Sequence, residues 1–114
     1  MSETSLKYEI IDQARGIALV QAPEQIIGGN EVYELSLIAS TIKKSDVNHL
    51  VLDSSKIIVI NSSGIGSMIA IMRTLAAKSI SFWIMKPSPK LIEILRITHL
   101  DKVLKLIDDI NIIQ

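Results

Sequence analysis

The 114-residue chain has no cysteine, few aromatic residues and no excess charge of either sign. Without cysteine it can form neither a disulfide framework nor a thiolate metal site, which excludes redox and zinc-ribbon proteins. Twelve basic residues balance twelve acidic ones, so no strong electrostatic field attracts nucleic acid. We therefore expect no metal, no cofactor and no nucleic-acid partner.

Long apolar runs are also missing. None approaches the roughly 18 residues of a membrane span, and residues 1–5 lack the basic and apolar stretches of an export signal. We expect a cytoplasmic protein without a membrane span. Apolar residues still make up 48% of the chain, enough for a core of Ile, Leu, Val, Met and Ala. The length predicts a single domain over residues 1–114.

Strand and helix patterns alternate along the chain. Leu6, Tyr8 and Ile10 alternate with charged residues, which predicts an edge strand with one face buried. Further strands are predicted over residues 17–22, 49–53, 57–60, 80–85 and 103–107. Helices are predicted from Asn30 to Lys44, after Gly64 to Lys78, from Ser88 to Ile97, and from Asp108 to Ile113.

This order of elements predicts the fold class. An initial hairpin followed by strands that alternate with helices is typical of an α/β protein with right-handed parallel crossovers. We expect a mixed sheet of four to five strands covered by about four helices.

Chemistry has one obvious place in such a fold, the strand-to-helix junction Asn61-Ser62-Ser63-Gly64. Backbone N–H groups at a helix start have no partner within the helix, and they favour an anion. Ser62 or Ser63 could serve only as an N-cap, worth about 1 kcal/mol. Alternatively, a phosphate on Ser63 would add roughly two negative charges and act as a binding switch. The spacing of these residues does not decide between a helix cap and a phosphorylated binding switch.

Two segments carry a resemblance to a known family. Val51-Leu52-Asp53 followed by Ile60-Asn61-Ser62-Ser63-Gly64-Ile65-Gly66 resembles the phosphorylation-site region of the anti-sigma factor antagonists, the STAS domain family. Gly28-Gly29-Asn30-Glu31 and residues 91–106 extend the likeness over nearly the whole chain. It implies a STAS-like fold and a non-enzymatic protein. The implied partners are an anti-sigma factor with serine-kinase activity and a serine phosphatase.

The resemblance also implies which residues matter. The second serine of the pair, Ser63, would be phosphorylated, with Ser62 as the second candidate. The unphosphorylated form would sequester the anti-sigma factor and release a sigma factor for transcription. Asn61 stands where an aspartate often precedes the serines. The expected partner-binding loop and helix comprise Asn61, Ser62, Gly64, Ile65, Ser67 and Ile71.

Ile71 is predicted to lie on the helix face opposite the core, together with Ser67, Ala70, Thr74 and Lys78. An exposed aliphatic side chain beside the Ser63 loop is a candidate partner contact. We accordingly expect Ile71→Asp to weaken kinase binding without unfolding the chain.

Three alternatives remain. A serine hydrolase would need Gly-x-Ser-x-Gly, which is absent around Ser63, and His99 as its base. A dinucleotide-binding domain would need glycine or alanine where Ile69 follows Gly64 and Gly66. A STAS adaptor or scaffold subunit of a stress-sensing or lipid-transport complex, not phosphorylated, would keep the same fold.

Overall fold

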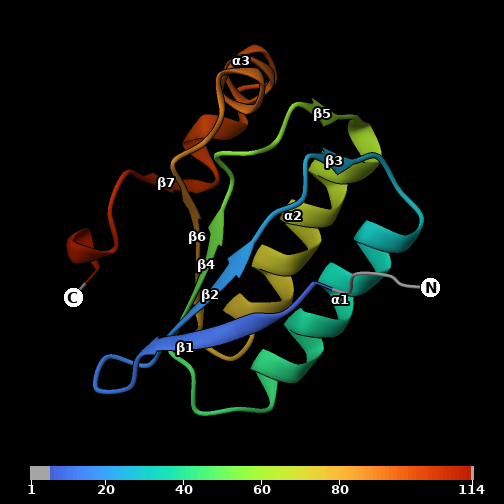
Figure 1. Cartoon of the computed structure of the whole chain (residues 1–114). Helices are drawn as coiled ribbons and strands as arrows, with labels where there is room; N and C mark the ends of the chain where they lie inside the picture. The colour runs from blue at the N-terminus through green and yellow to red at the C-terminus, as the bar shows by residue number, and fades with distance from the viewer. Residues whose placement is uncertain (1–5, 114) are drawn as a thin grey trace.

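The computed structural model describes residues 6–113 and has a five-stranded mixed sheet at its centre (Figure 1). The strands are β1 (Tyr8–Asp12), β2 (Ile17–Gln21), β4 (His49–Asp53), β6 (Ser81–Met85) and β7 (Lys105–Ile107). Their order is β1-β2-β4-β6-β7, with β1 antiparallel to β2 and every other pair parallel. The predicted α/β class is confirmed. The expected domain also takes in residues 1–5 and 114, which lie outside the described residues.

Three α-helices and two short 3-10 helices complete the described part of the chain. They are α1 (Asn30–Lys43), α2 (Ser62–Ala76), α3 (Pro89–Ile97), η1 (Leu100–Lys102) and η2 (Ile110–Ile112). Helices α1 and α2 pack side by side on one face of the sheet (Figure 1). Helix α3 begins as predicted, because the Ser88 hydroxyl accepts a hydrogen bond from the Leu91 N–H at 3.2 Å.

The two faces of the sheet carry separate apolar clusters, because successive strand residues point to opposite sides. The larger cluster lies under α1 and α2 and includes Leu50 and Leu52 of β4. The smaller cluster lies on the other face and includes Val51 of the same strand. Ile113 joins this second cluster with only 1% of its surface exposed. The final described residues therefore cover part of the face that the long helices leave open.

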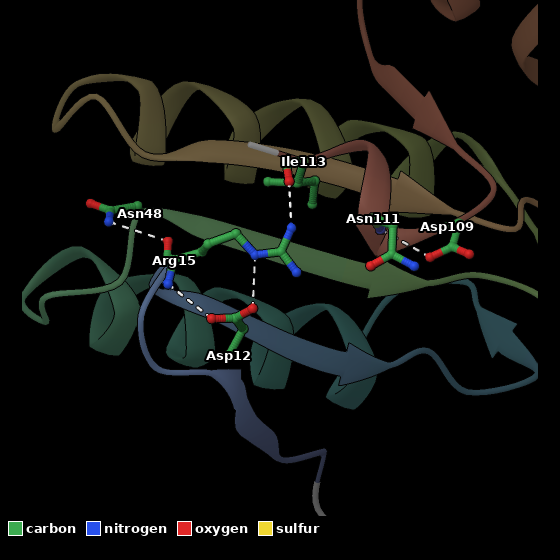
Figure 2. A network of polar contacts seen from close by, with 6 residues as sticks. All are labelled: Asp12, Arg15, Asn48, Asp109, Asn111 and Ile113. Atoms are coloured by element: carbon green, nitrogen blue, oxygen red, sulfur yellow. Dashed lines mark hydrogen bonds and ion pairs between the residues drawn. The ribbon is translucent and has the colours of Figure 1, made fainter.

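Arg15 holds this C-terminal segment in place (Figure 2). Its Nη1 donates to the carbonyl oxygen of Ile113 at 2.6 Å, and its Nε donates to Oδ2 of Asp12 at 2.7 Å. The Arg15 backbone N–H also donates to Oδ1 of Asp12, at 2.9 Å. This backbone hydrogen bond, followed by the guanidinium, lowers the pKa of Asp12 below its ordinary value. The hydrogen bond from Arg15 therefore attaches the turn after β1 to the last described residues of the chain.

Some predicted boundaries were wrong. Helix α1 begins at Asn30 as predicted, but Asn30, although a residue type suited to an N-cap, does not cap it: the N-cap is Gly29, whose φ of 63° favours glycine, and no side chain caps this helix. Only Val59–Ile60 of the predicted strand 57–60 is a strand, β5, and it lies outside the main sheet. It pairs with β3 (Gln25–Ile26), which the sequence analysis did not predict.

The C-terminal boundaries also differ from the prediction. The last strand starts at Lys105 because η1 occupies residues 100–102. The cap of the terminal helix is Asp109 instead of Asp108, and the helix is a single 3-10 turn. These short elements follow tertiary contacts more than a residue pattern.

The second face of the sheet holds a polar pair, His49 and Trp83. Trp83 Nε1 donates to Nδ1 of His49 at 3.1 Å. In this arrangement Nδ1 accepts the hydrogen bond and carries no proton. Partial burial, followed by the charges of Lys105 and Arg15, lowers the pKa of His49 below 6.5. Trp83, predicted as a core residue, is half-buried against the smaller cluster, with Lys105 Nζ 5.0 Å from its ring centroid.

This pair predicts a pH dependence of stability. The pKa of His49 is lower in the folded chain, so the unfolded chain binds more protons between the two pKa values. The free energy of unfolding should therefore fall as the pH drops below about 6.5 and through the folded-state pKa. Urea unfolding at a series of pH values measures this slope. The slope should be smaller in His49→Gln, and an unchanged slope would show that other groups cause it.

Candidate functional site

The Asn61–Gly64 loop connects β5 to α2 at one end of the molecule (Figure 1). Gln25 and Ile26 pair in parallel with Val59 and Ile60, which fixes the chain immediately before Asn61. The predicted strand-to-helix junction is thus present, although its strand belongs to the small two-stranded sheet. Its position depends on β3, far earlier in the sequence.

Asn61 is the N-cap of α2 and makes two side-chain hydrogen bonds. Its Oδ1 accepts from the Gly64 N–H at 3.0 Å, and its Nδ2 donates to the carbonyl oxygen of Ile27 at 2.9 Å. The prediction that Ser62 or Ser63 caps the helix was therefore wrong. An aspartate at this position could accept from Gly64 but has no proton to donate to Ile27. The structure thus gives the amide of Asn61 a local role.

Ser62 and Ser63 are the first two residues of α2, and both are exposed. Because Asn61 caps the helix, neither hydroxyl is needed for that purpose. No hydrogen bond within residues 6–113 involves either hydroxyl. Both serines therefore present free hydroxyl groups to solvent at the amino end of a helix.

Two glycines shape the space around Ser63. Gly28, with φ of 121°, passes close to it: a Cβ at Gly28 would lie 3.9 Å from Cβ of Ser63. Gly64 is buried, and a Cβ there would collide with the carbonyl oxygen of Ile26. The backbone that lies close to Gly64 is thus that of β3 in the same chain. Gly66 is exposed, with open space around it.

The two isoleucines of the predicted partner-binding loop and helix are buried. Ile71 is only 4% exposed and Ile65 9%, because α2 packs against α1 as well as against the sheet. Ser67 is half-buried, and its Oγ has no hydrogen-bond partner within the described residues. The prediction that Ile71 is exposed was wrong. A helix with neighbours on two sides has a wider buried face than a helix that covers a sheet alone.

Exposed apolar side chains lie instead on β5 and on residues next to β3 and β5. Ile58 is 62% exposed, and Ile27 and Val59 are each 43% exposed. Ile27 contacts Asn61 directly through its carbonyl group, and Val59 belongs to the strand that leads into the loop. We call these three residues the apolar rim. The residue pattern does not indicate this rim, because Ile57-Ile58-Val59-Ile60 has the composition of a buried strand.

Charge is absent from the chain around the loop. Residues 57–72 include no Lys, Arg, Asp or Glu. The amino ends of α1 and α2 lie at the same end of the molecule (Figure 1), and each carries a partial positive charge from its peptide dipoles. A negative group on Ser63 would be the only full charge on this segment.

Neither His99, the base of the alternative hydrolase model, nor His49 is part of this site. His49 is hydrogen-bonded to Trp83, and His99 is an exposed residue with positive φ after α3. No hydrogen bond among residues 6–113 joins Ser63 to a histidine. The same residues contain no group of acidic, histidine or cysteine side chains suited to a metal ion. None of their helices is long and apolar enough to cross a bilayer.

Comparison with known proteins identifies the family. A family model for the STAS domain matches residues 8–111. The match includes all five strands of the main sheet, α1 to α3, and the Ser63 loop. This chain belongs to the STAS domain family.

Solved structures with the same fold include several anti-sigma factor antagonists. One from Mycobacterium paratuberculosis matches with a TM-score of 0.73 and 20% identity, over 94% of this chain and 89% of that one. The unphosphorylated form of the antagonist SpoIIAA matches with a TM-score of 0.72 and 17% identity, over 90% and 87%. The phosphorylated form of SpoIIAA, a Bacillus cell fate determinant, matches with a TM-score of 0.68 and 17% identity, over 90% of both chains.

Proposed function

We propose that this chain is an anti-sigma factor antagonist that is switched by phosphorylation of Ser63. In its unphosphorylated form it binds an anti-sigma factor with serine-kinase activity and thereby releases a sigma factor in the cytoplasm. The chain is the substrate of this kinase and catalyses no reaction itself. Membership of the STAS family supports this proposal. So does a fold shared with SpoIIAA, which has been solved in both phosphorylated and unphosphorylated forms.

The main support for the proposal is that Asn61 and Ser63 have separate roles. Asn61 caps α2 through its bond to the Gly64 N–H, and Ser63 is exposed in the first turn. A kinase can therefore modify Ser63 without removing a helix cap. The partial positive charge at the helix start also tolerates the phosphate. Ser62 is the second candidate, because it is exposed in the same turn.

The apolar rim supplies the reason why a phosphate would change partner binding. Ile27, Ile58 and Val59 each expose an apolar side chain that an apolar partner patch can contact. A phosphate beside these side chains carries roughly two negative charges and would lose its water if the partner stayed bound. We infer that the phosphorylated form releases the partner, and that a serine phosphatase restores binding. The rim thus replaces Ile65 and Ile71 in the proposed contact.

Intact-mass analysis of the chain recovered from its own cells tests the switch. We expect a phosphate adduct on the wild-type chain that disappears in Ser63→Ala and persists in Ser62→Ala. Ser62→Ala is the matched control, because it removes the neighbouring hydroxyl and leaves the Asn61 cap in place. An adduct that persists in Ser63→Ala would place the modification elsewhere.

The complete absence of an adduct, with phosphatases inhibited and under stress, would contradict the switch. The unphosphorylated adaptor or scaffold role in a stress-sensing or lipid-transport complex would then be the better proposal. The fold is the same in both cases.

A further inference from the structure

The outer side of β1 is one of the two free edges of the main sheet (Figure 1). Within residues 6–113, β2 is its only strand neighbour, so the backbone N–H and C=O groups on the far side are unpaired. The Leu6 N–H donates to Oε1 of Glu34 at 3.1 Å, which fixes the chain beside α1 where it enters the strand. The register with β2 shifts between Ile10 and Asp12. Tyr8 to Ile10 are therefore the regular part of the free edge, and Leu6 and Lys7 lead into it.

A groove of about 570 Å³ runs between this edge and α1, and Leu6, Tyr8, Ile10 and Leu37 are among the residues that line it. Ile10 is 41% exposed and Leu37 47%. Tyr33, one turn before Leu37 on α1, is 60% exposed. Monomeric proteins usually protect a free edge with charged side chains, a β-bulge or a covering element. In residues 6–10 the charged Lys7 and Glu9 alternate with apolar side chains, and residues of both kinds line the groove.

The sequence of residues 6–10, Leu-Lys-Tyr-Glu-Ile, is complementary to itself in the antiparallel direction. If two copies pair with Tyr8 opposite Tyr8 of the second copy, Lys7 of each copy lies opposite Glu9 of the other. Leu6 then lies opposite Ile10 of the second copy. Cross-strand neighbours of opposite charge and of apolar character both stabilise an antiparallel pair.

Other registers lose this complementarity. A symmetric shift by two residues places Lys7 opposite Lys7, or Glu9 opposite Glu9, and like charges directly opposite are destabilising. An asymmetric shift by one residue aligns the apolar side of one strand with the charged side of the other. The charge pattern therefore selects one register and one partner, a second copy of this chain.

We propose that the chain forms a two-fold symmetric dimer through antiparallel pairing of residues 6–10, which joins the two five-stranded sheets into one. The interface is isologous, as in most homodimers. The exposed Leu37 lines the groove beside the joined edge and supplies apolar surface to the contact. No residue lining the groove belongs to the Asn61–Gly64 loop. The dimer therefore does not depend on the Ser63 switch, and either proposal can fail without the other.

Sedimentation equilibrium on the full chain, with charge-reversal variants, tests this pairing. Lys7→Glu and Glu9→Lys each turn both cross-strand ion pairs of the dimer into like-charge pairs. We expect each to raise the dimer dissociation constant by about tenfold or more. Both positions are exposed, so the variants should fold normally. The double variant K7E/E9K exchanges the two charges and should restore wild-type dimerisation.

Mixing the two single variants gives the sharpest result. A chain with glutamate at both positions should pair with a chain with lysine at both, although each alone associates poorly. A wild-type chain that stays monomeric up to millimolar concentration would overturn the proposal. So would a dimer whose dissociation constant is the same in the wild type, both single variants and their mixture, because its interface would then lie elsewhere.

Discussion

Gly64→Ala is expected to destabilise the chain by about 3 kcal/mol, near the upper end of the range for overpacking in a well-packed site. The added Cβ would collide with the carbonyl oxygen of Ile26 and lie 2.7 Å from Cγ1 of Ile60. The first contact is with backbone, which cannot rotate away as a side chain can. Either β3 or the start of α2 must move. Urea denaturation followed by circular dichroism measures the loss as a lower midpoint.

Gly66→Ala is the matched control for this experiment. It is the same substitution two residues further along α2, but nothing lies within 4 Å of the added Cβ. Alanine is a better helix former than glycine, so Gly66→Ala should stabilise the chain by up to about 1 kcal/mol. Equal destabilisation by both substitutions would contradict the packing described for Gly64. If a partner binds Gly66→Ala but not Gly64→Ala, its binding requires the intact contact between β3 and α2.

Ile71→Asp is expected to destabilise the fold strongly instead of probing a partner surface. The side chain is 4% exposed and belongs to the larger apolar cluster, between α2 and α1. Aspartate would leave a cavity and place a carboxylate among apolar side chains. The expected cost is about 4 kcal/mol or more. That is a large share of the 5–15 kcal/mol that typically stabilises a domain.

Ala70→Asp introduces the same charge one position earlier, at an exposed residue of α2. We expect it to change the free energy of unfolding by less than about 1 kcal/mol. Denaturant unfolding of the two variants side by side separates burial from charge. If Ile71→Asp were as stable as Ala70→Asp, the contact between α1 and α2 would differ from that described above. A binding defect in Ile71→Asp is interpretable only after this comparison.

The sequence predicted elements whose signals are local. His49–Asp53 is a strand with the predicted bounds, because a compact apolar run ends at a turn. Helix α3 was predicted from Ser88 and Pro89, since a capping hydroxyl followed by a first-turn proline depends only on neighbouring residues. The α/β class followed from the alternation of such elements.

The features that were missed depend on distant residues. Strand β3 has only two residues, and no periodic pattern can indicate a strand so short. All four residues of Asn61-Ser62-Ser63-Gly64 are acceptable N-caps. The choice of Asn61 depends on the Ile27 carbonyl group, which lies 34 positions earlier. The burial of Ile71 depends on where α1 packs, which the pattern of α2 alone does not reveal.

The candidate site was predicted in its location but not in its surface. Ser63 lies at the start of α2 and is exposed, as a modification site requires. The apolar rim comes from residues that a one-dimensional pattern assigns to the interior. Val59 is exposed because β5 pairs with β3 in a separate two-stranded sheet, and Ile58 is exposed immediately before that strand. A strand outside the main sheet does not have both faces covered.

The hydrogen bond from Arg15 to the carbonyl oxygen of Ile113 has a consequence for biosynthesis. It joins residues 98 positions apart, and the ribosome makes the arginine long before the isoleucine. Until Ile113 has left the exit tunnel, the face of the sheet around Ile17 and Val51 lacks its C-terminal cover. Docking of residues 110–113 is therefore the last step in covering this face, and a nascent chain stalled before Ile113 emerges would offer it to chaperones.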